Sequence, residues 1–170
     1  MPIKISESEQ VLFEANYPRV FRVVFLYCGS YNLAEEATQE AFFRACKNLH
    51  QLRDKASFSA WVTTIAINII KTDYNKQAKI RFVDFEKVAH ELACNRNDYE
   101  IIELKEEVRY MLNSLDDDHK EVLILRYMFD LSLNQISEMK KLSNGAVKSR
   151  LFRAREKLRN LQWKDGLADE

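Results

Sequence analysis

Apolar side chains near the end of the chain recur at the spacing of an α-helix. When residues 145–161 are placed at about 100° per residue, the apolar ones fall within about 40° of Val147. These residues are Val147, Leu151, Ala154, Leu158 and Leu161. The opposite side of the same turns holds polar residues and one aromatic, Phe152. The pattern predicts a helix that buries a narrow stripe and exposes its other faces.

Signals for the start of two further helices precede this segment. Asp116 is an expected N-cap, and the two aspartates after it place negative charge on the first turn of a helix ending near Phe129. Ser132 and Gln135 have the spacing of a capping box, which predicts a short helix ending near Lys140. A turn over 142–145 follows. A short capped helix, a turn and a basic helix form the pattern of a helix-turn-helix motif.

The first half of the chain also follows a helical period. We expect helices over about 8–28, 33–48 and 59–77, with a turn at 29–32 and a loop at 49–57. In the third helix an apolar stripe continues to Thr72 and contains Trp61, Ile65 and Ile69. A polar line lies beside this stripe and consists of Thr64, Asn68, Lys71 and Asn75.

The loop before the third helix mixes charged and aromatic residues. Arg53 and Lys55 come shortly before Phe58 and Trp61. Interleaved cations and aromatic rings are typical of sites for single-stranded nucleic acid. For the polar line on the third helix, the alternative is an ordinary exposed edge, which geometry alone favours; the adjacent loop adds weight to a binding site.

Composition supports an all-helical fold. The 170 residues include only three Gly and two Pro, whereas a β-sandwich or barrel needs many turn residues. We therefore expect an all-α fold of two small helical domains, 1–95 and 96–170, the second a helix-turn-helix. A flexible linker is expected around Asn95–Asp98, followed by a helix from about Tyr99 to Asn113.

Charge adds a candidate binding surface. The formal net charge is zero, but residues 140–159 contain eight Lys or Arg and one acid, Glu156. A basic stripe in a neutral protein indicates a local site for a polyanion, although a solvated helix face has the same composition. An exposed Phe152 on that face suits contact with a thymine methyl or a deoxyribose. The alternative for Phe152 is packing against a neighbouring helix.

Residues suited to catalysis or metal binding are not grouped. Glu36 and Glu40 are one helical turn apart, but His50, His90 and His119 are isolated and at no ligand spacing. The three cysteines are far apart and include no Cys-x-x-Cys, as is typical of reduced thiols. We expect no enzyme activity, catalytic residue, metal, cofactor or small-molecule substrate.

The sequence also indicates a cytoplasmic protein. Its first residues lack the apolar region of a signal peptide, and no apolar run approaches the ~18 residues of a membrane span.

Three segments resemble bacterial sigma factors. Residues 32–45 are similar to the core-polymerase-binding helix, usually D-A-E-D-x-x-Q-E-x-F-x-x-A. Residues 58–68 resemble the family's F-x-x-W-L-x-x-I-A-x-N segment, and residues 145–155 resemble G-T-V-K-S-R-L-x-R-A-R of the fourth sigma region. The resemblance covers most of 15–77 and 110–160. Because no third domain lies between them, it points to the extracytoplasmic-function group, which directs RNA polymerase to promoters.

The resemblance implies roles for particular residues. Docking on the clamp helices of the polymerase β′ subunit is implied for Glu36, Gln39 and Glu40. Contact with unpaired bases of the −10 element is implied for Leu52, Arg53, Lys55, Asn68 and Lys71. Contact with the −35 element in the major groove is implied for Lys148, Ser149, Phe152 and Arg153. The segment 115–129 would meet the β flap, and an anti-sigma factor is an expected partner.

The chain departs from the family pattern at several positions. Leu52 stands where some relatives have an aromatic, and Asp54 where a glycine is common, so the −10 preference stays open. Ala146 replaces a threonine whose hydroxyl could cap the recognition helix or bond a phosphate, and residues 135–137 depart from the usual E-I-A.

Two alternative functions belong to other classes. A stand-alone helix-turn-helix regulator would bind duplex DNA as a dimer and would need no polymerase-docking helix. A helical phosphohydrolase would need His and Asp ligands on facing helices, and no such pair occurs.

Overall fold

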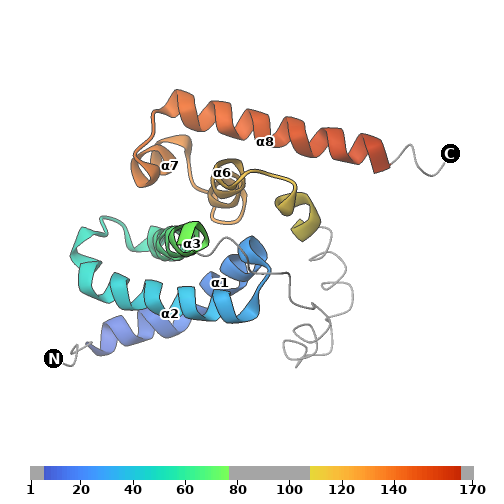
Figure 1. Ribbon diagram of the computed structural model, residues 1–170. Coiled ribbons are helices and arrows are strands. Elements are labelled where there is room, and N and C mark those ends of the chain that lie inside the picture. Colours follow the sequence, from blue (N-terminus) through green and yellow to red (C-terminus); the bar gives the residue numbers. More distant parts are fainter. Residues whose placement is uncertain (1–5, 77–107, 166–170) are drawn as a thin grey trace. The chain divides into compact units, whose positions relative to one another are not determined.

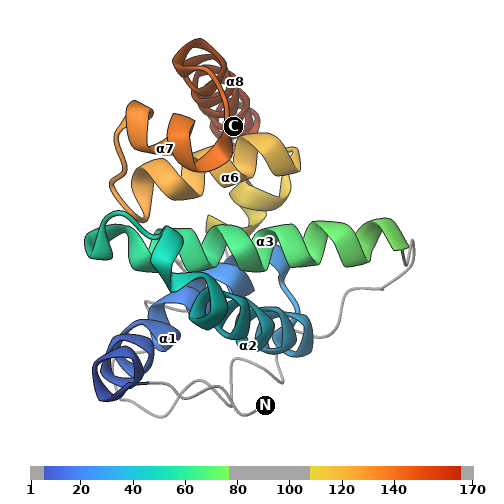
Figure 2. The same cartoon turned by 90° about the vertical axis from the view of Figure 1, so that its left-hand side faces the viewer.

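The described part of the chain forms two compact helical units. The computed structural model describes residues 6–76 and 108–165, with side chains described as far as Thr72 in the first range and Leu161 in the second. Within these ranges the structure contains helices and turns and no strand (Figure 1 and Figure 2). The predicted all-α fold of two small domains is confirmed. The boundary between 95 and 96, the linker at 95–98 and the helix start near Tyr99 lie outside the described residues.

The first unit consists of three helices that pack against one another. They are α1 (Glu7–Cys28), α2 (Tyr31–Asn48) and α3 (Phe58–Lys76). Two short 3₁₀ turns, η1 (Leu49–Gln51) and η2 (Lys55–Ser57), connect α2 to α3. The three predicted helices are confirmed to within about two residues at each end.

Local caps explain where α1 and α2 begin and end. The Ser6 hydroxyl accepts the backbone N–H of Glu9, and the Glu9 carboxylate accepts the backbone N–H of Ser6 at 2.7 Å, so a capping box opens α1. Helix α1 ends at Gly29, whose φ of 70° is the left-handed conformation that glycine adopts without a Cβ clash. The Ser30 side chain then caps α2 by accepting the N–H of Leu33, so the predicted turn at 29–32 is shorter than expected.

Aromatic rings form the centre of the first unit. Phe13 of α1 lies 5.7 Å from Phe42 of α2 and 5.5 Å from Phe58 of α3, measured between ring centroids. The Phe42 and Phe58 rings are 6.0 Å apart in an edge-to-face arrangement. Such pairs add to the free energy gained by burying the rings. One aromatic residue from each helix therefore holds the three helices together.

Helix α3 is buried on more sides than its sequence pattern predicts. Its most buried large apolar residues are Phe58, Val62, Ile67 and Ile70, whereas Trp61 and Ile65 of the expected stripe are only half-buried. The most buried residues of α3 therefore do not coincide with the predicted apolar stripe, although Ile69 of that stripe is buried. The reason is that α3 packs against both α1 and α2, so two faces of the helix are covered instead of one.

The second unit contains the predicted helix-turn-helix. Its helices are α6 (Asp117–Tyr127), α7 (Leu133–Lys140) and α8 (Asn144–Asp165), and residues 108–113 are also helical. The capping box at α7 is confirmed: the Ser132 hydroxyl accepts the N–H of Gln135 at 3.2 Å, and the Gln135 side chain accepts the N–H of Ser132 at 2.8 Å. Asp116 precedes α6 as predicted, but its side chain makes no cap bond to the helix backbone.

Ser143 caps the start of α8. Its hydroxyl accepts the backbone N–H of Ala146 at 3.1 Å. This bond replaces the capping role that a threonine at position 146 could have had, so the departure at Ala146 does not leave α8 uncapped. The turn before α8 bends at Lys141, whose φ is 52°.

A buried ion pair connects α6 to α7. The Glu121 carboxylate, 1% exposed, pairs with the Lys140 ammonium, whose side chain is 12% exposed. Such a pair is stable only when both members stay together, because either charge alone would be costly to bury. Lys140, counted in the sequence as part of a basic surface, is instead largely covered and paired within the second unit.

Candidate nucleic-acid interface

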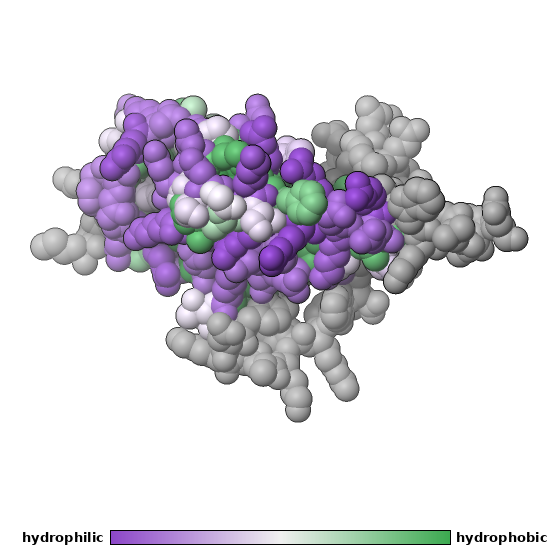
Figure 3. All heavy atoms as spheres, turned by 90° about the horizontal axis from the view of Figure 1, so that it is seen from above, coloured by the Kyte–Doolittle hydropathy of each residue, from purple (hydrophilic) through white to green (hydrophobic). Residues whose placement is uncertain are grey.

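The outward face of α8 exposes all four residues predicted to contact duplex DNA. Val147, Leu151 and Ala154 of the predicted apolar stripe are buried, and Leu158 and Leu161 farther along it are half-buried. On the other side, the four candidates are exposed: Lys148, Ser149, Phe152 and Arg153. Phe152 is 59% exposed, so it does not pack within its own unit. In the view of Figure 3 the surface is dominated by hydrophilic residues, with only isolated apolar ones.

The basic residues of 140–159 divide into two groups. Four are in ion pairs with acids of the same unit: Lys140 with Glu121, Arg150 with Asp118, Lys157 with Asp116 and Arg159 with Glu156. The other four, Lys141, Lys148, Arg153 and Arg155, make no ion pair within the described residues, and of these Lys148 and Arg153 lie on the outward face. The cations available to a polyanion are therefore fewer than the sequence indicates.

Asp116 is held as a carboxylate at the start of α6. A hydrogen bond from His119, with Nδ1 3.3 Å from Oδ2, and the positive charge of Lys157 lower the pKa of Asp116 below its ordinary value. The acid therefore stays ionised over the whole physiological range, and it keeps a negative charge beside α8.

The polar line predicted on α3 is exposed only in part. Asn68 is exposed and Lys71 is half-buried, but Thr64 is only 6% exposed, so its assignment to an exposed line is wrong. Thr64 is covered because α3 packs against two helices. The side chain of Asn75 lies outside the described residues. Asn68 is thus the most accessible member of the line.

The loop before α3 has a defined shape. Asp54 has an extended backbone, with φ of −131°, and its carboxylate accepts the N–H of Ala56 at 3.0 Å and the hydroxyl of Ser57 at 3.2 Å. A glycine is therefore not required there for a left-handed conformation. Arg53 and Lys55 are exposed and Leu52 is half-buried.

The aromatic residues expected beside this loop differ in accessibility. Phe58 is 1% exposed and belongs to the core, so its predicted place in a nucleic-acid site is wrong. Trp61 is half-buried, with its ring centroid 6.3 Å from that of Phe58. Of the two rings, only Trp61 has surface left to contact a base.

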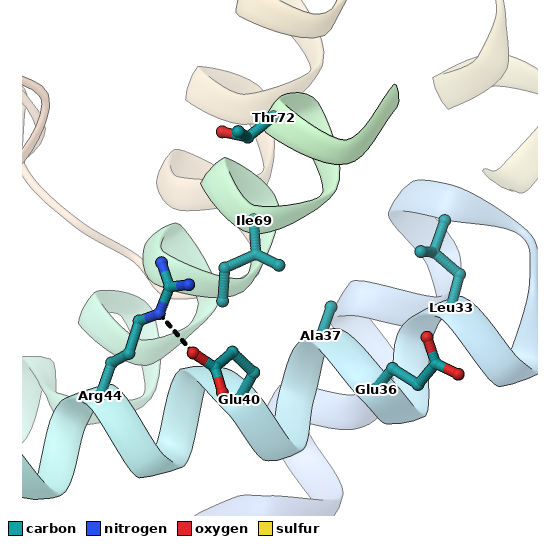
Figure 4. Close-up of a pocket in the computed structure, with 7 residues that line it drawn as sticks. All are labelled: Leu33, Glu36, Ala37, Glu40, Arg44, Ile69 and Thr72. Carbon is teal, nitrogen blue, oxygen red and sulfur yellow. Dashed lines mark hydrogen bonds and ion pairs between the residues drawn. The ribbon is translucent and has the colours of Figure 1, made fainter. Parts of the chain in front are cut away.

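The three residues predicted to dock on polymerase lie along one side of α2. Glu36 and Gln39 are exposed, and Glu40 is half-buried and pairs with Arg44 at 2.7 Å. Figure 4 shows the Glu40 carboxylate turned toward Arg44. A groove of about 270 Å³ runs between α2 and α3, and its lining residues are Leu33, Glu36, Ala37, Glu40, Arg44, Ile69 and Thr72.

Sequence reasoning missed Phe43 on the same helix. Phe43 is 47% exposed, and the Lys47 ammonium lies 4.0 Å from its ring centroid. It stands one turn after Gln39, so the helical spacing from Gln39 could have identified it. Phe43 also lines an apolar groove of about 340 Å³ between α1 and α2, together with Phe13, Glu14, Tyr17, Phe42 and Cys46. Burial raises the pKa of the Cys46 thiol, and the charge of Glu9 raises it further.

The described residues contain no group of three or more His, Cys, Asp or Glu placed to hold a metal ion. Among the helices in the described ranges, none combines the length and the apolar character needed to cross a lipid bilayer.

Comparison with known proteins identifies both units. Residues 12–80 match the family model of sigma-70 region 2, and residues 105–158 match that of sigma-70 region 4. The chain is 27% identical over 152 residues to the ECF RNA polymerase sigma factor SigW of Bacillus subtilis (strain 168), covering 83% of this chain and 81% of SigW. It is 28% identical over 170 residues to the ECF RNA polymerase sigma factor EcfG of Rhodopseudomonas palustris (strain TIE-1), covering 99% of this chain and 92% of EcfG.

A solved structure has the same fold. The sigma factor RpoE of Bartonella quintana, crystallised in complex with the anti-sigma factor NepR, aligns with a TM-score of 0.72 at 19% identity. The alignment covers 92% of this chain and 98% of that one. With a region 2 unit, a region 4 unit and relatives of one group, the chain belongs to the sigma-70 family as an RNA polymerase sigma factor of the extracytoplasmic-function type.

Proposed function

We propose that the outward face of α8 contacts the −35 element of promoters through Lys148, Ser149, Phe152 and Arg153. The observation that supports this most is the exposure of Phe152 beside two cations without an ion pair in the described residues. An apolar ring in water has no structural purpose there, whereas a thymine methyl or a deoxyribose would cover it. Lys148 and Arg153 are free to reach phosphates or base edges.

Substitution of Phe152 tests this proposal. Phe152→Ala in the full chain should weaken duplex binding with little change in the salt dependence of the affinity, because no charge is removed. Tyr127→Ala is the matched control, since Tyr127 is an aromatic residue of the same unit with 58% of its surface exposed. Thermal melting is measured in parallel. A large fall in melting temperature for Phe152→Ala, with unchanged duplex affinity, would contradict the assignment.

Arg153 distinguishes two modes of contact. If Arg153 binds only phosphate, Arg153→Ala weakens all duplex sequences alike and lowers the salt slope by about one unit. If it binds a guanine edge, the loss is concentrated at one base pair of the −35 element and is roughly 1–3 kcal/mol. Equal affinity and slope for Arg153→Ala and the native chain would remove Arg153 from the interface.

We also propose that α2 docks on the clamp helices of the polymerase β′ subunit through Glu36, Gln39 and Glu40, with segment 115–129 meeting the β flap. The exposed line on α2 supports this, and Phe43 extends it by one turn. An exposed ring on the same line as exposed polar side chains suits a protein interface, where aromatic residues supply much of the binding energy.

Charge reversal tests the docking helix. Glu36→Lys should weaken binding to core polymerase while leaving helicity unchanged, because Glu36 is exposed. Glu138→Lys, the same charge change at an exposed position of α7, is the matched control. Co-elution of the native chain with core polymerase in gel filtration separates a sigma factor from a stand-alone duplex-binding regulator. Equal polymerase affinity for the two variants would count against the α2 assignment.

For the −10 element we propose that Leu52, Arg53, Lys55, Asn68 and Lys71 hold unpaired bases. Exposure of Arg53, Lys55 and Asn68 supports this, as does the half-buried Trp61 nearby. In this role the chain traps melted DNA while the polymerase performs the chemistry, so the chain itself is not an enzyme and acts in the cytoplasm. An anti-sigma factor is the proposed regulator, as it is the partner of RpoE in the Bartonella quintana complex.

A further inference from the structure

The first turn of α6 lies against one edge of α8. Asp118 Oδ2 is 3.1 Å from Nη2 of Arg150, and Asp116 Oδ2 is 3.7 Å from Nζ of Lys157. Arg150 and Lys157 are seven residues apart, so they occupy the same edge of α8 two turns apart. Two acids at the start of one helix therefore engage two cations along the other.

This edge adjoins the proposed DNA-binding face. On the helical projection Arg150 and Lys157 lie between the buried stripe of Val147 and the outward position of Arg153. The Arg150 side chain is 29% exposed and the Lys157 side chain is 47% exposed, so solvent reaches both. If the acids were absent, the two cations of this edge would become available to the phosphate backbone of a duplex lying on α8.

We propose that Asp118 and Asp116 compete with DNA phosphates for Arg150 and Lys157, and so limit the sequence-independent affinity of α8. This inference rests on the proposed contact of α8 with duplex DNA. A carboxylate occupies each cation as a phosphate oxygen would, and phosphate contacts supply most of the non-specific affinity. The base-contacting residues on the outward face then account for a larger share of the binding, which favours discrimination between sequences.

The expected size of the effect is modest. Ion pairs between exposed side chains are weak, equivalent to about a twofold to fivefold change in an equilibrium constant. Each cation released to bind a phosphate adds about 0.9 to the steepness of the dependence of log affinity on log salt concentration. The salt slope is thus the more decisive measurement, because a general change in charge shifts affinity without adding a contact.

The experiment compares Asp118→Asn with Asp117→Asn in the full chain, using a short duplex of unrelated sequence over a range of salt concentrations. Asp117 is exposed, lies in the same helical turn and makes no ion pair within the described residues, so it matches the charge change without releasing Arg150. We expect Asp118→Asn to bind about twofold to fivefold more tightly at low salt, with a slope steeper by about 0.9. Asp117→Asn should show a smaller gain and the native slope.

Arg150→Ala supplies the second test. In the native background it should leave the slope unchanged, because Asp118 already occupies the guanidinium. In the Asp118→Asn background it should remove the gain. Asp116→Asn with and without Lys157→Gln repeats the comparison at the other pair, and asparagine remains a good N-cap residue.

Three results would contradict the inference. Equal slopes for Asp118→Asn and Asp117→Asn would overturn the inference while leaving the −35 proposal intact. A loss of about one unit of slope for Arg150→Ala alone would also overturn it, since Arg150 would then contact phosphate despite Asp118. A native chain that binds no duplex would overturn the inference and the −35 proposal together.

Discussion

The buried pair between Glu121 and Lys140 yields a prediction with a large expected magnitude. Replacing Glu121 with alanine leaves the Lys140 ammonium, 12% exposed, without its carboxylate partner. Breaking a buried pair by removing one member costs about 3–5 kcal/mol, because the remaining charge is poorly solvated. For a unit of this size each kcal/mol lowers the melting temperature by roughly 4–8 °C, so the expected fall is at least about 12 °C.

Hydrogen exchange measured by mass spectrometry in the full chain is the assay, because it reports the stability of each unit separately. Amides of α6, α7 and α8 should lose protection in Glu121→Ala, whereas those of α1 to α3 should not change. Glu156→Ala is the matched control: it breaks the exposed pair with Arg159 in the same unit and should cost under about 1 kcal/mol.

A double substitution tests the physical reason. Glu121→Leu combined with Lys140→Met removes both charges, and replacing a buried pair by apolar residues of similar volume is often neutral or stabilising by about 1–4 kcal/mol. The double variant should therefore recover most of the lost protection. If Glu121→Ala reduced the stability of the second unit no more than Glu156→Ala does, leaving the Lys140 charge unpaired would not be costly, and the reasoning would be refuted.

Three further predictions concern the −10 surface, the helix cap and the response to pH. Asn68→Ala should impair transcription from a duplex promoter more than from a template with a pre-melted bubble, since losing a hydrogen bond to an unpaired base costs on the order of 1–3 kcal/mol; an equal response on both templates would remove Asn68 from strand trapping. Ser143→Ala should destabilise the second unit by about 1 kcal/mol in urea unfolding, because the N–H of Ala146 loses its acceptor; no change would mean that water replaces the cap. Because the pKa of Asp116 is lowered, its contribution to stability is present above pH 3.8 and is lost as the pH falls further. The melting temperatures of the native chain and Asp116→Asn should therefore differ above pH 3.8 and converge below it. A difference in melting temperature that stays constant with pH would contradict the lowered pKa.

Local features of this fold could be predicted from the sequence to within a residue or two. The capping box of Ser132 and Gln135 spans four residues, so the chain contains both partners of each bond within one helical turn. The outward position of Phe152 on α8 could be predicted for a similar reason. Its angle to Val147 and Leu151 depends only on the helical period, and the exposure of Phe152 and burial of the other two agree with that angle.

The exposure of candidate site residues was predicted less well where it depends on how helices pack against one another. Phe58 and Thr64 looked accessible by spacing, but both are buried because α3 packs against α1 and α2 at once. Phe43 was missed for the opposite reason. An aromatic beside Phe42 in a helical segment suggests core, and only the position of α1 shows that Phe42 is covered and Phe43 is not.

The sequence alone determined the helices, the capping box of α7, the narrow stripe of α8 and the family motifs, because each depends on residues within a few turns of one another. The tertiary structure alone decided which charges are available. Glu121 and Lys140 are 19 residues apart, and Asp118 and Arg150 are farther apart still. Whether a cation is neutralised or faces solvent depends on where a distant acid comes to lie, since Coulomb energies fall with distance in space and not along the chain.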